Sequence, residues 1–116
     1  MKVTRIFTGD DGESHFEDID IEMTVGEFGA LISEPVDAKA VLFRRVEGDY
    51  DVDFHNAPRK QYVVNLNGSV EIETGHGERR VLGPGEILLA EDTTGRGHQS
   101  RSPDGKPRDC LFIPLA

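Results

Sequence analysis

Three polar side chains, His55, Gln61 and His98, have types and spacing that could support chemistry. An imidazole can exchange protons near neutral pH and can also bind a transition metal. A glutamine amide offers one acceptor and two donors, which need partners if the side chain is buried. The stretch from residue 55 to residue 98 is therefore the first place to look for a site.

The elements that must position these side chains are predicted to be short β-strands. Turn-forming residues recur every eight to twelve positions, and no window has the apolar period of a helix over three turns. Regular short strands with turn signals indicate an all-β sandwich or barrel. The predicted strands cover about residues 3–8, 16–23, 30–33, 38–46, 61–66, 69–74, 78–82, 86–91, 97–101 and 108–114.

Strand alternation indicates which side chains face inward. In a strand over residues 38–46, alternate residues share a face, and each of the two faces carries apolar residues and one arginine. Either Arg44 or Arg45 is therefore predicted to point into a cavity. In residues 61–66 the same rule directs Gln61 and Asn65 inward together, and a ligand or the two histidines would then have to pair with the Gln61 amide.

Composition limits the classes of protein and partner. The 116 residues fit a single domain covering 1–116, and the net charge of -9 argues against nucleic acid and membrane surfaces as partners. The single cysteine, Cys110, cannot form an internal disulfide, and the N-terminus lacks the apolar run of a signal peptide. We expect a cytoplasmic protein.

The spacing from Gln61 to Gly68 resembles the first motif of the cupin superfamily, in which a glutamate, six residues and a glycine follow a His-x-His pair. His55 matches the first histidine and Gln61 stands at the glutamate. In the second motif Gly85 matches the first glycine, His98 the histidine and Ser102 the asparagine, while the motif's proline is absent. The resemblance covers about residues 40–114.

This resemblance implies a double-stranded β-helix, or jelly-roll barrel, of roughly ten antiparallel strands. Residues 1–37 would form N-terminal strands, and residues 38–114 the core barrel that carries both motifs. N-terminal strands of small cupins often add to a partner's sheet, and the apolar faces of residues 3–8 and 19–23 need cover. We therefore expect a homodimer.

The resemblance leaves two alternatives for a cofactor. One is a divalent transition metal, Fe, Ni, Cu or Zn, and the other is no metal. Two imidazoles and an amide bring no negative charge to a cation, which weakens binding. Asp53 is two residues before His55, so the two side chains lie on the same face if that segment is an extended strand. The Asp53 carboxylate could then join the ligands. The candidate metal ligands are His55, Gln61, His98 and Asp53.

Three classes of function stay open, all with a small molecule as the partner. The first is a metal-assisted oxygenase or isomerase, and the second a metal-free isomerase or cyclase with a histidine as general base. The third is a non-catalytic module that binds a small metabolite. The catalytic candidates are His55 and His98, and the substrate-binding candidates are Gln61, Arg44 and Asn65.

Two further histidines and one basic pair are predicted to lie at the surface. His15 and His76 have turn-like, acidic or glycine-rich neighbours, which favours exposed positions. Arg59 and Lys60 are interpreted as part of a solvated rim, because no glycine-rich loop opening a helix accompanies them.

Overall fold

The computed structural model describes residues 1–116 and is all-β, with twelve strands and one short 3-10 turn. The strands are β1 (Lys2–Thr8), β2 (Ser14–Asp20), β3 (Thr24–Val25), β4 (Leu31–Ile32), β5 (Leu42–Val46), β6 (Asp51–His55), β7 (Gln61–Asn67), β8 (Val70–Thr74), β9 (Arg79–Leu82), β10 (Ile87–Glu91), β11 (His98–Arg101) and β12 (Arg108–Pro114), and the turn η1 is Glu27–Gly29.

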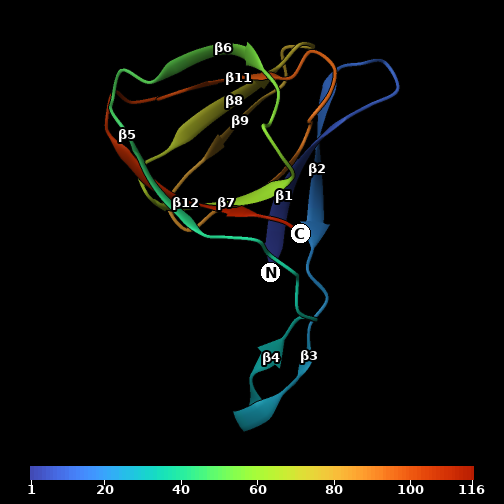
Figure 1. Ribbon diagram of the computed structural model, residues 1–116. Coiled ribbons are helices and arrows are strands. Elements are labelled where there is room, and N and C mark those ends of the chain that lie inside the picture. Colours follow the sequence, from blue (N-terminus) through green and yellow to red (C-terminus); the bar gives the residue numbers. More distant parts are fainter.

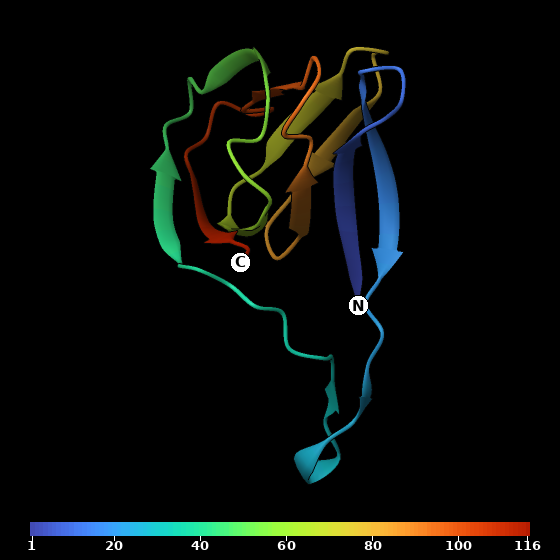
Figure 2. The ribbon, with the colours of Figure 1, turned by 45° about the vertical axis from the view of Figure 1, so that its right-hand side comes forward.

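Ten of the strands form two sheets. One sheet has six strands in the order β2-β1-β10-β7-β12-β5, and the other has four in the order β6-β11-β8-β9. Figure 1 shows the four-stranded sheet above β7 and β12, with β1 and β2 at one side. The remaining strands, β3 and β4, form a small hairpin that extends away from both sheets (Figure 2).

One strand pair departs from the expected antiparallel arrangement. β1 lies between β2 and β10, antiparallel to the former and parallel to the latter. The expectation of antiparallel strands throughout is therefore wrong at β1 and β10. Parallel pairing needs a long connection, and the many residues between these two strands provide one.

The core lies between the sheets because both turn apolar side chains toward each other. Ile6, Leu88 and Ala90 come from the six-stranded sheet, and Val70 and Ile72 from the four-stranded sheet. Burial in β8 alternates residue by residue, which is the pattern of a strand with one buried face. This packing buries Ile6 of β1 within its own chain.

The hairpin of β3 and β4 leaves several apolar side chains exposed. Val25, Phe28, Leu31 and Ile32 all lie in this projecting segment, and the Phe28 side chain is fully exposed. The chain contains no helix with the length and apolar character that a membrane crossing requires.

Candidate functional site

A cavity of about 310 Å³ lies between the two sheets. Its volume is at the lower end of the range for small-molecule sites, roughly 300 to 1,000 Å³. Ten hydrophobic residues from both sheets and the adjoining loops form most of the wall, and no aspartate or glutamate is among the lining residues. The polar and charged residues of the wall, with one tyrosine, are Arg44, Tyr50, His55, Gln61, Asn65, His98, Ser100 and Arg108.

Five of the six site residues predicted from the sequence lie around this cavity: Arg44, His55, Gln61, Asn65 and His98. The two imidazole rings are neighbours, with centroids 4.6 Å apart and ring planes inclined by 58°. They are neighbours because β6 and β11 pair antiparallel with His55 directly opposite His98. The backbone at Gly97 approaches this point closely, since a Cβ there would overlap the His55 carbonyl oxygen.

Asp92 determines how the His98 ring is held. Its carboxylate is 0% exposed, and Oδ2 lies 2.5 Å from His98 Nδ1. The Ser14 hydroxyl donates to the same oxygen across 2.7 Å. With Nδ1 as the donor in this contact, Nε2 faces away from the carboxylate and is left as an acceptor. Ser14 contacts the carboxylate and not the imidazole, so it positions Asp92 and is not an activated nucleophile.

Sequence reasoning missed Asp92, although the sequence holds a signal for it. Leu88, Ala90 and Asp92 are all buried and follow one another at two-residue spacing. An acidic residue that continues the buried face of an apolar strand needs a partner, because an unpaired buried carboxylate is strongly unfavourable. That requirement could have directed attention to Asp92 and to a histidine in the following strand.

A β-bulge turns Asp53 away from the histidines. Ser100 pairs with Val52 and His98 with His55. Between these two pairs, two residues of β6 lie opposite a single residue of β11. The additional residue breaks the strict alternation from Val52 to His55, and both of these residues line the cavity. The expectation that Asp53 shares a face with His55 therefore does not match the structure.

The Asp53 carboxylate has its own partners outside the cavity. It accepts from the Phe54 backbone N–H at 2.8 Å and from Gln99 Nε2 at 2.9 Å. Both hydrogen bonds lower the pKa of Asp53, and the bond from the Phe54 backbone has the larger effect. Its backbone carbonyl oxygen lies 2.8 Å from His55 Nδ1, so this residue orients the His55 ring through the main chain.

Gln61 is buried, at 3% exposed, and its partner differs from the expected one. Its Oε1 accepts a hydrogen bond from Arg59 Nη1 at 2.8 Å. Neither histidine is needed to satisfy this oxygen. The expectation that a ligand or the histidines would have to pair with the Gln61 amide is wrong for Oε1. Arg59, a residue predicted to lie at the solvated rim, donates to this oxygen instead.

Two arginines line the end of the cavity bounded by β5, β7 and β12. Arg44 is the arginine of its strand that faces inward, whereas Arg45 is exposed and bonded to Asp109. Arg108 is only 5% exposed, and its Nη1 lies 3.5 Å from Asn65 Oδ1. Sequence reasoning missed Arg108, although it shares strand parity with the apolar residues Cys110 and Phe112.

The cavity residues do not fit a metal centre. Without Asp53 the candidate ligands are two neutral imidazoles and the Gln61 oxygen, which already accepts from a guanidinium group. Such a set has no negative charge, and the nearby Arg59 cation opposes another. Asp92 lies behind His98 and does not line the cavity. The arrangement suits acid–base chemistry at an imidazole better.

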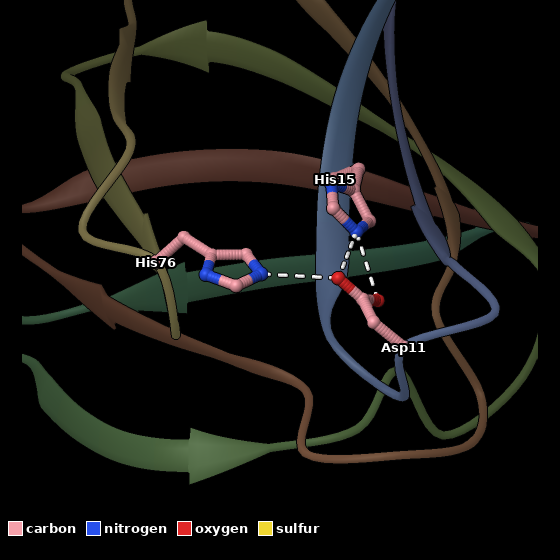
Figure 3. A group of neighbouring side chains, drawn as sticks. All are labelled: Asp11, His15 and His76. Atoms are coloured by element: carbon pink, nitrogen blue, oxygen red, sulfur yellow. Dashed lines mark hydrogen bonds and ion pairs between the residues drawn. The ribbon is translucent and has the colours of Figure 1, made fainter.

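A second cluster of metal-ligating side chains lies at the surface, between the β1–β2 and β8–β9 turns (Figure 3). His15 Nε2 and His76 Nε2 each lie 3.0 Å from an Asp11 carboxylate oxygen. Hydrogen bonds from His15 and then His76 lower the pKa of Asp11 well below its usual range. Both histidines are partly exposed, but the sequence did not indicate that they meet.

Comparison with known proteins defines the fold only. No family model and no curated protein matches the chain. Among solved structures it is similar to protein NMB1881 from Neisseria meningitidis, with 17% sequence identity and a TM-score of 0.51. The similarity covers 66% of this chain and 72% of that chain. At this level of identity the comparison supports a shared arrangement of strands and no shared activity.

Proposed function

We propose that the chain is a small cupin that binds a small organic molecule between its two sheets. The proposal is supported by the motif spacing around His55, Gln61 and His98 and by two facing sheets that enclose a cavity lined by all three side chains. A jelly-roll barrel is the arrangement that these features favour. The apolar wall with a few convergent polar groups is typical of a ligand site.

We further propose that the protein is a metal-free isomerase or cyclase in which His98 moves a proton. The observation that carries this proposal is the hydrogen bond between His98 Nδ1 and the buried Asp92 carboxylate. This bond leaves Nε2 to accept a proton from bound substrate, and the carboxylate stabilises the imidazolium that results. Returning the proton to another substrate atom completes an isomerisation without any oxidant or reductant.

The other residues in the cavity orient the substrate in this proposal. His55 lies against the His98 ring and limits where a substrate atom can approach it. The Gln61 amide, with its oxygen held by Arg59, presents its nitrogen as a donor for a substrate oxygen. The apolar wall excludes water, which strengthens hydrogen bonds made inside the cavity.

The test follows proton exchange at carbon. Compounds that bind the native protein, found in a panel by ligand-observed NMR, are incubated with it in heavy water, and loss of a C–H signal is followed. We expect exchange with native protein and none with His98→Gln, while binding persists. Binding without exchange for every compound would favour the non-catalytic metabolite-binding module. If the compounds change the NMR signals only of protein residues outside the cavity, the result would contradict both proposals.

We also propose a homodimer. The exposed apolar side chains of the β3–β4 hairpin support it, because a contiguous apolar surface is a common site of association. Sedimentation or light scattering measures the mass directly, and a monomer at all accessible concentrations would contradict it.

A further inference from the structure

The cavity differs in charge from the protein that surrounds it. The chain has a net charge of -9, yet the lining residues include two arginines and no acidic side chain. Six of the nine arginines contact an aspartate or glutamate: Arg5, Arg45, Arg79, Arg80, Arg96 and Arg101. Of the other three, Arg44 and Arg108 line the cavity, and Arg59 donates to Gln61, which lines it.

Arg108 is a buried charge with little compensation. Its side chain contacts Asn65 Oδ1 at a long 3.5 Å, and its Nε is buried without any hydrogen-bond partner. Burial, and then the nearby Arg44 charge, lower the pKa of this guanidinium. An uncompensated buried cation is strongly unfavourable, so its position calls for an anion that the protein itself does not provide.

Arg44 is close to Arg108 and equally without an acidic partner. Its guanidinium carbon lies 4.8 Å from the Phe112 ring centroid and 5.3 Å from that of Tyr50. The Arg108 guanidinium carbon lies 5.7 Å from the same Tyr50 ring. The one hydrogen bond of the Arg44 side chain goes to the Cys110 sulfur, at 4.0 Å from Nη1. Two like charges therefore lie against one aromatic ring.

The strand register separates this cationic end from the histidines. Asn65, which contacts Arg108, lies on β7 four residues after Gln61, a distance of roughly 13 Å along an extended strand. Gln61 pairs with Ala90, two residues before Asp92. Apolar residues make up most of the cavity wall.

We propose that the ligand is a small carboxylate whose anionic group lies at Arg44 and Arg108 and whose apolar body extends toward His55 and His98. The inference rests on the proposed cavity function and names its ligand class. A planar carboxylate matches the donor geometry of guanidinium groups and supplies the missing charge. The ligand's opposite end then reaches the proton-transferring imidazole.

The test compares two probes of nearly equal shape, 3-phenylpropanoate and the neutral 3-phenylpropanamide. Titration calorimetry at low salt is expected to show the carboxylate binding about tenfold more tightly than the amide, or better. Arg108→Met and Arg44→Met should each remove this preference and leave amide binding within about twofold. Arg45→Met, on the same strand as Arg44 but facing outward, should leave both affinities unchanged.

The outcomes separate this inference from the proposed function. Equal affinity of native protein for the two probes would overturn the anion assignment while leaving a small-molecule cavity in place. Binding of neither probe would also overturn it, whereas proton transfer at His98 is judged by the separate exchange experiment. The comparison in native protein needs no variant, so a misfolded Arg108→Met protein would not prevent a decision.

A second inference rests on the independent cluster of Asp11, His15 and His76. The three potential ligand atoms lie within 4.8 Å of one another, and the 3.0 Å between each imidazole nitrogen and the carboxylate is close to the ligand separation of a tetrahedral centre. Gly9 makes room for the His15 ring, because a Cβ there would lie 2.6 Å from it. We propose that this cluster binds Zn²⁺, with water completing the coordination.

Calorimetric titration with Zn²⁺ tests this site in untagged protein. One saturable site is expected, weakened about tenfold or more by His76→Ala, since one of three protein ligands is lost. His55→Ala removes a cavity histidine and should leave Zn²⁺ binding unchanged. Absence of saturable binding, or binding that depends on His55 instead, would overturn the assignment.

Discussion

The His98 imidazole and the Asp92 carboxylate are only six residues apart in the chain and meet across 2.5 Å in the interior. The carboxylate belongs to the residue that follows β10 and the imidazole to the start of β11, so the loop between them folds back on itself. This contact chooses the imidazole tautomer, and it distinguishes the proposed acid–base site from a pair of surface histidines.

Replacing Asp92 with asparagine should change which nitrogen of the His98 imidazole carries the proton. The amide of the new side chain could donate to Nδ1, which would move the imidazole proton to Nε2 and reduce proton transfer by about 10²- to 10⁴-fold. Imidazole ¹⁵N shifts report the tautomer, and heavy-water exchange reports the transfer. Ser14→Ala, which removes only the other donor to the carboxylate, should keep the native tautomer. An unchanged tautomer in Asp92→Asn would contradict the assigned role.

Gly97→Ala should disturb the contact between β6 and β11. Gly97 has φ of 80°, and a Cβ there would overlap the His55 carbonyl oxygen. Gly85 also has φ of 80° but meets nothing within 4 Å, so Gly85→Ala carries backbone strain alone. We expect Gly97→Ala to lower the free energy of unfolding by about 1 to 3 kcal/mol more than Gly85→Ala. Urea denaturation measures the difference, and equal losses would refute the close-contact explanation.

Arg108→Met should stabilise the ligand-free protein. Methionine keeps much of the arginine's length while removing a buried charge that has one long hydrogen bond, so the free energy of unfolding should rise by about 1 to 3 kcal/mol. Urea denaturation without ligand measures this gain. At the same concentration, 3-phenylpropanoate should stabilise native protein more than the variant, because the variant is expected to bind the carboxylate about tenfold more weakly. A large loss of stability would show that Arg108 has a structural role.

Stability should fall at acid pH through Asp53 and Asp109. Hydrogen bonds lower the folded-state pKa of both, chiefly from the Phe54 backbone for Asp53 and from Arg45 for Asp109. Their contribution is therefore present above the unfolded pKa of about 3.9 and is lost as pH falls through the lower folded value. Thermal unfolding of Asp109→Asn should show a shallower decline below about pH 4. Arg45→Met, which removes the partner, should have the same effect, and an unchanged slope in both would contradict this.

The exposed hairpin should control association. Phe28 is fully exposed at the hairpin tip, with φ of 58°. If the hairpin forms the proposed dimer interface, Phe28→Ser should weaken dimerisation by about tenfold or more, since a buried aromatic is typically a major contributor to an interface. Sedimentation velocity gives the dissociation constant. Val81→Ser, at an exposed apolar position on β9, is the matched control and should not affect it.

Much of the site could be predicted from local pattern. Strand alternation places Gln61 and Asn65 on one face, and the structure puts both on the cavity. The same pattern in residues 38–46 required one arginine to face inward, and Arg44 does so. These predictions succeed because side chains of a regular strand alternate between its two faces, so the residues that share a face can be identified from the sequence.

The prediction for Asp53 failed because β6 departs from regular alternation where it pairs with β11. Alternation holds only while a strand stays regular, and the bulge between β6 and β11 adds one residue. Whether a bulge forms depends on the partner strand, which lies more than forty residues further along the chain. The Arg59 contact with Gln61 likewise depends on how a loop returns to the cavity.

By itself, the sequence determined an all-β chain of short strands and the inward face that carries Gln61 and Asn65, because these follow from local periodicity and turn chemistry. Only the tertiary structure decided that Asp92 holds His98, that Asp53 turns outward, and that Arg44 and Arg108 share a cavity without any acid. Those relationships depend on strand register and on the meeting of distant segments, which no local pattern encodes.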